Sequence, residues 1–234
     1  MQLTFASYNI HKAVGLDRRR DPDRIIAVLR EIDADIVALQ EADRRFGERT
    51  SVLPRAALDD HTPYRAVPLS GRPGSMGWHG NALLVRRGIE LIEAEVVPLP
   101  TLEPRGAVRA DLLAGGQRIR VVGMHLDLSG LRRRQQVRAV LAHLGRCAGD
   151  AQSVLMGDLN EWAQHGGCLR EFGRDWRVLS CGHSFPTRRP VAQLDRIVIS
   201  SAWQVLETKV HHSALSFRSS DHLPVYTRLE LPKK

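Results

Sequence analysis

Short apolar runs rich in β-branched residues alternate along this chain with longer segments whose apolar residues have helical spacing. Runs of about four to eight apolar residues predict buried strands, whereas apolar residues three or four positions apart predict helices. The alternation therefore predicts a domain in which strands and helices pack as layers, of the α/β or α+β class. We expect strands at residues 3–9, 34–41, 81–85, 118–128, 153–162, 193–200 and 223–231, and helices at 21–32 and 131–144.

The size and composition of the chain fit one domain. It has 234 residues, 43% of them hydrophobic, and no Pro/Gly/Ser-rich linker or repeat interrupts it, so we predict a single domain over residues 1–234. Its three cysteines lack CxxC spacing, which argues against a disulfide framework or a zinc site. No apolar stretch approaches the roughly 20 residues that span a bilayer, and the first residues lack the basic region of a signal peptide. We therefore expect a cytoplasmic protein and a monomer.

The charge balance is strongly basic, with a net charge of +8 and an isoelectric point near 10.1. Such a balance favours an anionic partner, such as nucleic acid or a phospholipid surface. The chain contains 34 lysines and arginines, of which only four are lysines. Because this skew is also typical of genome base composition, the arginines could equally form ordinary solvated faces.

Several of the predicted strands end on polar side chains that a core cannot easily absorb. Asn9 and Glu41 end the first two strands, and His125, Asp158 and Asn160 stand at the ends of two later ones. Singly, each has an ordinary interpretation as a turn former, a helix cap or a core histidine. Together, however, side chains at adjacent strand ends converge on one edge of a sheet, so we expect one polar cluster.

Two carboxylates in such a cluster repel each other unless a cation lies between them, so Glu41 and Asp158 indicate a bound metal ion. Oxygen ligands favour a hard ion, Mg²⁺ or Mn²⁺, over zinc. The motifs GxxxxGKS/T, GxGxxG after a strand, GxSxG and HExxH are all absent from the sequence. The glycine-rich segment at 71–77 precedes a strand and not a helix, so we expect a flexible surface loop there.

Seven segments follow one another along the chain: SYNI, LQEAD, GNALLV, GMHLDL, GDLNEW, FPTRRPVAQLDRIVIS and SSDHLPV. As a set they resemble the motifs of the endonuclease/exonuclease/phosphatase superfamily, which includes DNase I-like and exonuclease III-like enzymes. The NIHK opening and the PRG segment at 104–106 resemble most an uncharacterised bacterial branch of metal-dependent hydrolases. The resemblance implies an α+β fold, a four-layered αββα sandwich of two mixed β-sheets flanked by helices, with the active site at one edge of the two sheets.

The resemblance also implies roles for the residues at matching positions. Glu41 resembles the principal Mg²⁺ ligand, with Asn9 beside it and Asp221 completing the metal ligands. Asp158 and Asn160 resemble the pair that orients the attacking water and contacts the phosphoryl oxygens.

Two histidines complete the implied catalytic set. His222 with Asp195 resembles the family's carboxylate–histidine dyad, and His125 resembles the histidine near the phosphate and the leaving oxygen. Both Asp158 and His222 are candidates for the general base. Arg105, Asn81 and His11 are candidate substrate-binding residues, although Arg105 could be an ordinary surface arginine and His11 a structural residue.

These features predict a Mg²⁺-dependent hydrolase, with Mn²⁺ as the other possible ion, that acts on phosphoric ester bonds by in-line attack of water. We place nuclease activity slightly ahead of activity on a phospholipid, as in sphingomyelinases, or on a small phosphodiester or phosphomonoester. A hypothesis from another class is a catalytically silent module that binds nucleic acid or protein. Silent relatives usually lack one or more site residues, whereas every expected one is present here.

Overall fold

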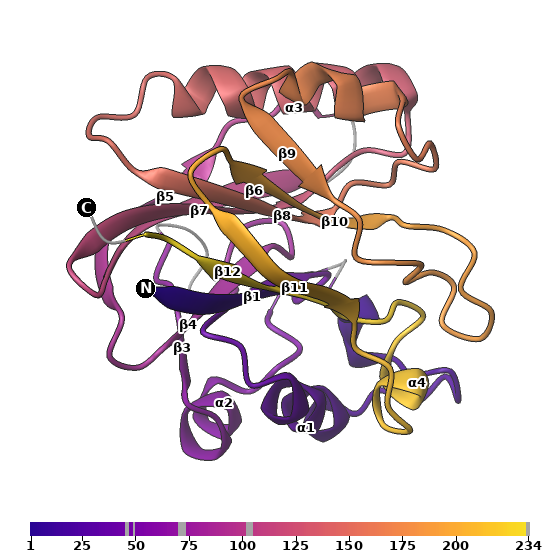
Figure 1. Cartoon of the computed structure of the whole chain (residues 1–234). Coiled ribbons are helices and arrows are strands. Elements are labelled where there is room, and N and C mark those ends of the chain that lie inside the picture. Colours follow the sequence, from indigo (N-terminus) through magenta and orange to yellow (C-terminus); the bar gives the residue numbers. More distant parts are fainter. Residues whose placement is uncertain (45–46, 49, 70–73, 102–104, 233–234) are drawn as a thin grey trace.

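In the computed structural model, which describes residues 1–44, 47–48, 50–69, 74–101 and 105–232, the strands form two mixed sheets that are stacked face to face (Figure 1). The order in the first sheet is β11 (Gln204–Val210), β12 (Val225–Glu230), β1 (Gln2–Asn9), β2 (Ile36–Gln40), β4 (Ala82–Arg86) and β3 (Tyr64–Ala66). The order in the second is β5 (Glu90–Val97), β6 (Gly106–Ala114), β7 (Gln117–His125), β8 (Gln152–Asp158), β10 (Asp195–Ser200) and β9 (Trp176–Leu179).

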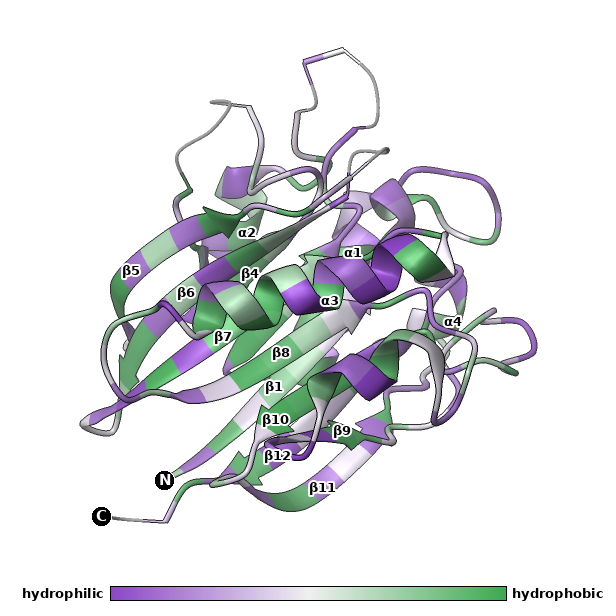
Figure 2. Cartoon of the chain, turned by 90° about the horizontal axis from the view of Figure 1, so that it is seen from above, coloured by the Kyte–Doolittle hydropathy of each residue, from purple (hydrophilic) through white to green (hydrophobic). Residues whose placement is uncertain are grey.

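Helices cover the outer face of each sheet. The first sheet is covered by α1 (Pro22–Ile32) and α2 (Arg55–His61), and the second by α3 (Gly130–Leu144) with a 3₁₀ helix, Gly167–Phe172. Figure 2 shows α3 lying over the second sheet, and also the alternating hydrophilic and hydrophobic residues along the edge strand β5. Two short elements, the 3₁₀ helix His11–Ala13 and α4 (Ser216–Ser219), lie in connections beside the first sheet.

Three buried clusters lie between these four layers. The largest fills the space between the sheets and includes Phe5 and Trp203, whose rings meet edge to face with centroids 5.4 Å apart. A second lies between the first sheet and α1, and the third lies between the second sheet and α3. The predicted α+β fold, a four-layered αββα sandwich, is therefore confirmed.

Local sequence signals explain where the main helix begins. The Asp21 side chain accepts hydrogen bonds from the backbone N–H groups of Asp23 and Arg24, and Pro22 occupies the first turn. Such a cap contributes about 1 kcal/mol to helix stability. Ile25 is fully buried, as expected for an apolar residue on the inner face of the helix predicted at 21–32, so that helix is confirmed.

Strand register determines which side chains meet at the end of the second sheet. His125, the last residue of β7, is paired with Asp158, the last residue of β8, and Asp158 is in turn paired with Asp195, the first residue of β10. On the other side, His125 is paired with Gly106, which follows Arg105. We call this end of the two sheets the site edge.

A glycine is required beside Asp158. A Cβ atom at Gly157 would lie 1.8 Å from the carbonyl oxygen of Met124 on the neighbouring strand, well inside contact distance. Only glycine therefore allows β7 and β8 to approach closely enough to pair His125 with Asp158.

Two expectations from the sequence are wrong in part. The arginines could form ordinary solvated faces, but Arg133 on α3 is buried and contacts Glu161 at 3.3 Å, because that carboxylate compensates its charge. Residues 71–73 of the expected surface loop lie outside the described residues, whereas Ser75 and Met76 are buried, since Asp43 accepts hydrogen bonds from both.

Among the described residues, no helix is both long enough and apolar enough to cross a membrane.

Candidate active site

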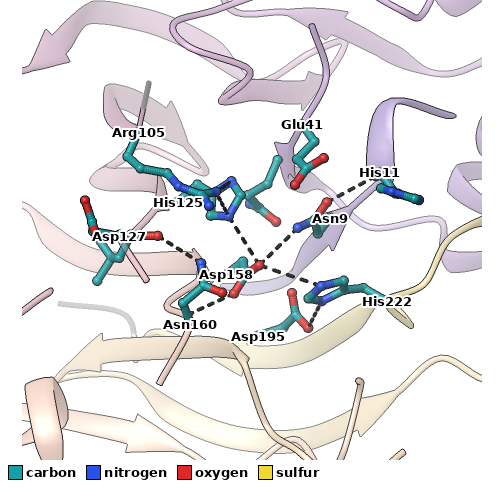
Figure 3. A network of polar contacts seen from close by, with 12 residues as sticks. Asn9, His11, Glu41, Arg105, His125, Asp127, Asp158, Asn160, Asp195 and His222 are labelled. Carbon is teal, nitrogen blue, oxygen red and sulfur yellow. Dashed lines mark hydrogen bonds and ion pairs between the residues drawn. The ribbon is translucent and has the colours of Figure 1, made fainter. Parts of the chain in front are cut away.

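Asp158 is the central side chain of the site edge, and it is 2% exposed (Figure 3). Its Oδ2 atom accepts a hydrogen bond from Asn9 Nδ2 at 3.0 Å and lies 3.4 Å from His125 Nε2 and 3.7 Å from His222 Nε2. Burial would raise the pKa of Asp158, but the positive charge of His222 and the hydrogen bond from His125 hold it well below its ordinary value. Asp158 is therefore a carboxylate surrounded by donors.

Asp195 and His222 form a buried pair, the contact that the family resemblance implies. His222 Nδ1 lies 2.8 Å from Asp195 Oδ2, which also accepts a hydrogen bond from the Ser184 hydroxyl. Burial opposes the charged form of His222, but Asp195 and Asp158 outweigh it and raise the pKa of His222 to about 10. The imidazole is thus an imidazolium at neutral pH, and the Phe185 ring covers it at a centroid distance of 4.6 Å.

Glu41 follows β2 and stands beside Asn9, because Asn9 is paired with Gln40 in the register of the first sheet. The Glu41 carboxylate contacts the Lys12 ammonium. Burial would raise the pKa of Glu41, but the positive charges of His125 and Lys12 hold it below its ordinary value. Glu41 is therefore ionised and only 23% of its side chain is exposed.

Asp221 and His11 lie together at the outer side of the site edge. His11 Nδ1 is 3.7 Å from Asp221 Oδ1, and 38% of each side chain is exposed. The His11 backbone N–H donates to Asn9 Oδ1 at 3.1 Å, which ties this turn to the end of β1. Asp221 thus lies near the expected cluster, but its contact is with His11.

Arg105 lies against His125, because Gly106, the residue after Arg105, is paired with His125 in the second sheet. Its Nη1 atom lies 3.0 Å from His125 Nδ1. Asn81 is fully buried, and its Oδ1 atom has no hydrogen-bond partner among the described residues. Its Nδ2 atom donates to the carbonyl oxygen of Trp78 at 3.3 Å.

Asn160, two residues after Asp158, adopts a left-handed backbone conformation, with φ of 49°. Its backbone N–H donates to Asp158 Oδ1 at 2.9 Å, and its Nδ2 atom donates to the carbonyl oxygen of Leu126 at 2.9 Å. The first bond fixes the Asp158 carboxylate against the loop that follows it, and the second ties Asn160 to the segment that follows β7. The structure therefore brings Asn9, His125, Asp158, Asn160, Asp195 and His222 into one network.

Sequence reasoning missed three side chains that hold this network in place. Ser220 donates to the backbone carbonyl of Asn9 at 2.7 Å and so joins the SDH segment to β1. Ser184 fixes Asp195, and Asp43 accepts hydrogen bonds that hold the chain near Gly80. Ser184, Asp43 and Ser220 all lie within or beside the segments that carry the family resemblance, which was the only available signal.

Two sets of residues at the site edge could hold a metal ion. Asp158, Asp195 and His222 offer ligand atoms within 4.8 Å of one another, although they are already bonded to each other. Glu41 and Asn9 offer a carboxylate and an amide oxygen, which are hard ligands. Among the described residues only Lys12 donates to the Glu41 carboxylate, and Asn9 Oδ1 accepts only the His11 N–H, so both retain free lone pairs and fit Mg²⁺ or Mn²⁺.

A pocket of about 540 Å³ opens beside the site edge. It adjoins Asp221, because the backbone N–H of Thr187 donates to the Asp221 carbonyl at 2.8 Å and Arg188 comes next. Arg24 is paired with Asp17 at 3.1 Å, whereas no described residue pairs with the Arg218 guanidinium. The lining residues are Leu16, Asp17, Arg24, Arg188, Phe217 and Arg218.

The fold and this site define the class of the protein. The model of the Endonuclease/Exonuclease/phosphatase family matches residues 6–222, and the chain belongs to that family. The sequence is similar to the uncharacterized protein YbhP of Escherichia coli (strain K12), with 29% identity over 95% of this chain and 94% of that protein. The members of this family are hydrolases that act on phosphoester bonds.

Solved structures with the same fold include a phosphatase and a protein bound to single-stranded DNA. A mannosyl-6-phosphatase of Bacteroides thetaiotaomicron, Bt3783, is 20% identical, with a TM-score of 0.76 over 98% of this chain and 100% of that one. TDP2 of D. rerio, in a complex with a single-stranded DNA product, is 18% identical, with a TM-score of 0.75 over 98% of this chain and 99% of that one. At these identities the likeness shows the fold alone.

Proposed function

We propose that this protein is a Mg²⁺-dependent phosphodiesterase that hydrolyses nucleic acid by in-line attack of water. The observation that carries the proposal is the environment of Asp158. The ionised, buried Asp158 carboxylate is surrounded by Asn9, His125 and the His222 imidazolium. Glu41, whose carboxylate can bind a metal ion, lies at the same edge. This arrangement combines a proton acceptor with donors for phosphoryl oxygens.

Glu41 and Asn9 would hold the divalent ion, and Mn²⁺ fits the same oxygen ligands. When bound, the ion supplies positive charge that stabilises the phosphoryl oxygens as negative charge develops. The free lone pairs of both residues support this assignment.

Each remaining side chain has a role that its contacts support. Asp158 orients the attacking water and accepts its proton, because it is ionised, whereas His222 is already protonated and has no free acceptor nitrogen. The His222 imidazolium, fixed by Asp195, binds a non-bridging oxygen of the phosphate. Arg105 and His125 lie on the other side of Asp158, where they bind the leaving oxygen.

The pocket beside the site edge favours nucleic acid as the substrate. Arg188 and Arg218 supply cations for further phosphates of a strand, and Phe217 supplies a ring face on which a base can stack. The net charge of +8 supports the same choice.

A phospholipid is the second candidate, because large apolar side chains are exposed in the segments that follow the site residues. Leu128 and Leu131 come after His125 and are 63% and 67% exposed, and Trp162 comes after Asn160 and is 63% exposed. Such residues can enter a lipid surface next to anionic headgroups.

A substrate panel tests the proposal. The purified protein is incubated with about 5 mM Mg²⁺, about 5 mM Mn²⁺ or excess EDTA. The substrates are single-stranded DNA, plasmid DNA, RNA, cardiolipin, sphingomyelin and bis-p-nitrophenyl phosphate. We expect cleavage of nucleic acid and of the small diester, with no cleavage in EDTA. Preferential cleavage of a lipid would replace the substrate assignment, and full activity in EDTA would overturn the metal assignment.

A further inference from the structure

Lys12 is an unusual residue in this chain because of where it lies. Only four of the 34 basic residues are lysines, and the other three, Lys209, Lys233 and Lys234, are near the C-terminus. The ammonium of Lys12 contacts Glu41 Oε2, and the two side chains are only 26% and 23% exposed. A compact, strongly charged group is therefore held directly on the residue that fits a metal ion.

The backbone that carries Lys12 adopts a conformation that L-residues rarely take. His11, Lys12 and Ala13 have φ values of 45°, 57° and 58°, and Glu41 opposite them has φ of 55°. Consecutive non-glycine residues in this region persist only when surrounding contacts impose the conformation, and such strain gathers at functional sites.

Specific hydrogen bonds impose this turn. The Lys12 backbone N–H donates to the Glu41 carbonyl at 3.2 Å, and Arg20 Nε donates to the Lys12 carbonyl at 3.2 Å. The Asp21 N–H donates to the Ala13 carbonyl at 2.8 Å. The fold therefore holds the backbones of Lys12 and Glu41 together, and the ion pair between their side chains is built in.

We propose that Lys12 is a phosphate-binding residue of the active site, which shares Glu41 with the metal ion and holds a non-bridging oxygen of the substrate phosphate. This inference rests on the proposed function. An ammonium has three donor hydrogens, so it can keep one bond to Glu41 while another reaches the substrate. Its positive charge also competes with a divalent cation for the same carboxylate.

The proposal makes opposite predictions for two ligands. Removing the charge of Lys12 strengthens metal binding, because Glu41 loses a competing cation, and weakens phosphate binding, because the phosphate loses a donor. A residue that only shaped the turn would affect both ligands in the same direction or neither.

Calorimetry on the full chain tests this with Mn²⁺ alone and with inorganic phosphate added to the Mn²⁺-loaded protein. For Lys12→Met we expect the Kd for Mn²⁺ to fall by roughly 3- to 10-fold and the Kd for phosphate to rise by about 10-fold or more. Lys12→Arg, which keeps the charge, should bind phosphate within about 3-fold of the wild type. Lys209→Met removes an exposed lysine on β11 and serves as the matched control, with both constants unchanged.

Weaker Mn²⁺ binding in Lys12→Met, or unchanged phosphate binding, would overturn the proposal. Because Met and Arg both carry a Cβ atom, the two variants leave the strain at residue 12 as it is, and circular dichroism checks that they fold. If Lys12→Met fails to fold, Lys12→Arg decides, and phosphate binding more than about 10-fold weaker than wild type overturns the proposal. Neither measurement requires turnover, so a negative substrate panel would refute the proposed function and leave this result standing.

Discussion

Asn9 Nδ2 donates a hydrogen bond to Asp158 Oδ2 over 3.0 Å, although the two residues are 149 positions apart in the sequence. Asn9 is the last residue of β1 in the first sheet, and Asp158 is the last residue of β8 in the second. The bond therefore joins the ends of the two sheets. Because the two sheets are stacked and strands of both end on polar side chains at the same edge, one site contains residues of both sheets.

Replacing Asn9 with Asp places a second carboxylate next to Asp158, where the two charges repel. We expect Asn9→Asp to lower the free energy of unfolding at pH 7 by roughly 1–3 kcal/mol, measured by urea denaturation. Because one carboxylate of the pair binds a proton more readily, the loss should be smaller at pH 5. Asn9→Ala removes the donor without adding charge and should cost less at pH 7. Equal losses in the two variants would show that the charges do not meet.

The pairing of Asp195 with His222 predicts a pH dependence with a definite sign. Because the pKa of His222 is raised to about 10, above its unfolded value, the pair adds stability that is fully present below pH 6.5 and is lost as pH rises toward 10. In Asp195→Asn, one of the two carboxylates is removed, so the pKa of His222 should fall, which an NMR titration of the imidazole measures. Asp175→Asn changes an exposed carboxylate and serves as control. An imidazole titration that does not move in Asp195→Asn would contradict the pairing.

Gly157→Ala tests whether the close approach of β7 and β8 is required. Because the new methyl group would lie 1.8 Å from the Met124 carbonyl oxygen, the strands must separate. We expect a loss of roughly 2–4 kcal/mol in stability, measured by urea denaturation. Gly130→Ala, where the nearest atom is the end of the Arg133 side chain at 3.6 Å, is the control and should be nearly neutral. A Gly157→Ala protein with wild-type stability and hydrolysis would show that the pairing of β7 with β8 does not require glycine at this position.

The arginines of the pocket should contribute to binding of long substrates only. For the double variant Arg188→Gln and Arg218→Gln, we expect KM for a 20-nucleotide single strand to rise by about 3- to 10-fold, with a weaker salt dependence, because two phosphate contacts are lost. KM for bis-p-nitrophenyl phosphate should stay unchanged, since this diester has one phosphate. Arg146→Gln, an exposed arginine after α3, is the matched control. An equal rise in KM for both substrates would place the pocket within the catalytic centre.

The residues at strand ends could be predicted because the signal is local. An apolar run that stops at Asn9, His125 or Asp158 is visible in the sequence, and the structure ends β1, β7 and β8 at those residues. Which strand ends become neighbours depends on pairing between distant segments, so the row from His125 through Asp158 to Asp195 could not be derived from local pattern.

The missed elements have physical causes. The sequence pattern does not predict β6 because Arg109 and Asp111 interrupt its apolar run. Both residues are nevertheless buried, since they pair with each other at 2.8 Å and Arg120 also pairs with Asp111. β5 and β11 are edge strands, with one face exposed and a weak apolar signal. The role of Lys12 was invisible because it depends on three consecutive left-handed residues, which no sequence rule predicts.

The central claim is that Asp158 drives hydrolysis of a phosphate ester at this edge, and Asp158→Asn tests it most directly. The substitution keeps the size of the side chain and removes the charge that faces His125 and His222. With bis-p-nitrophenyl phosphate and saturating Mg²⁺, we expect kcat to fall at least about 100-fold, which is about 2.7 kcal/mol of transition-state stabilisation, in a protein that remains folded. A folded Asp158→Asn variant with kcat within about 3-fold of the wild type would contradict the account.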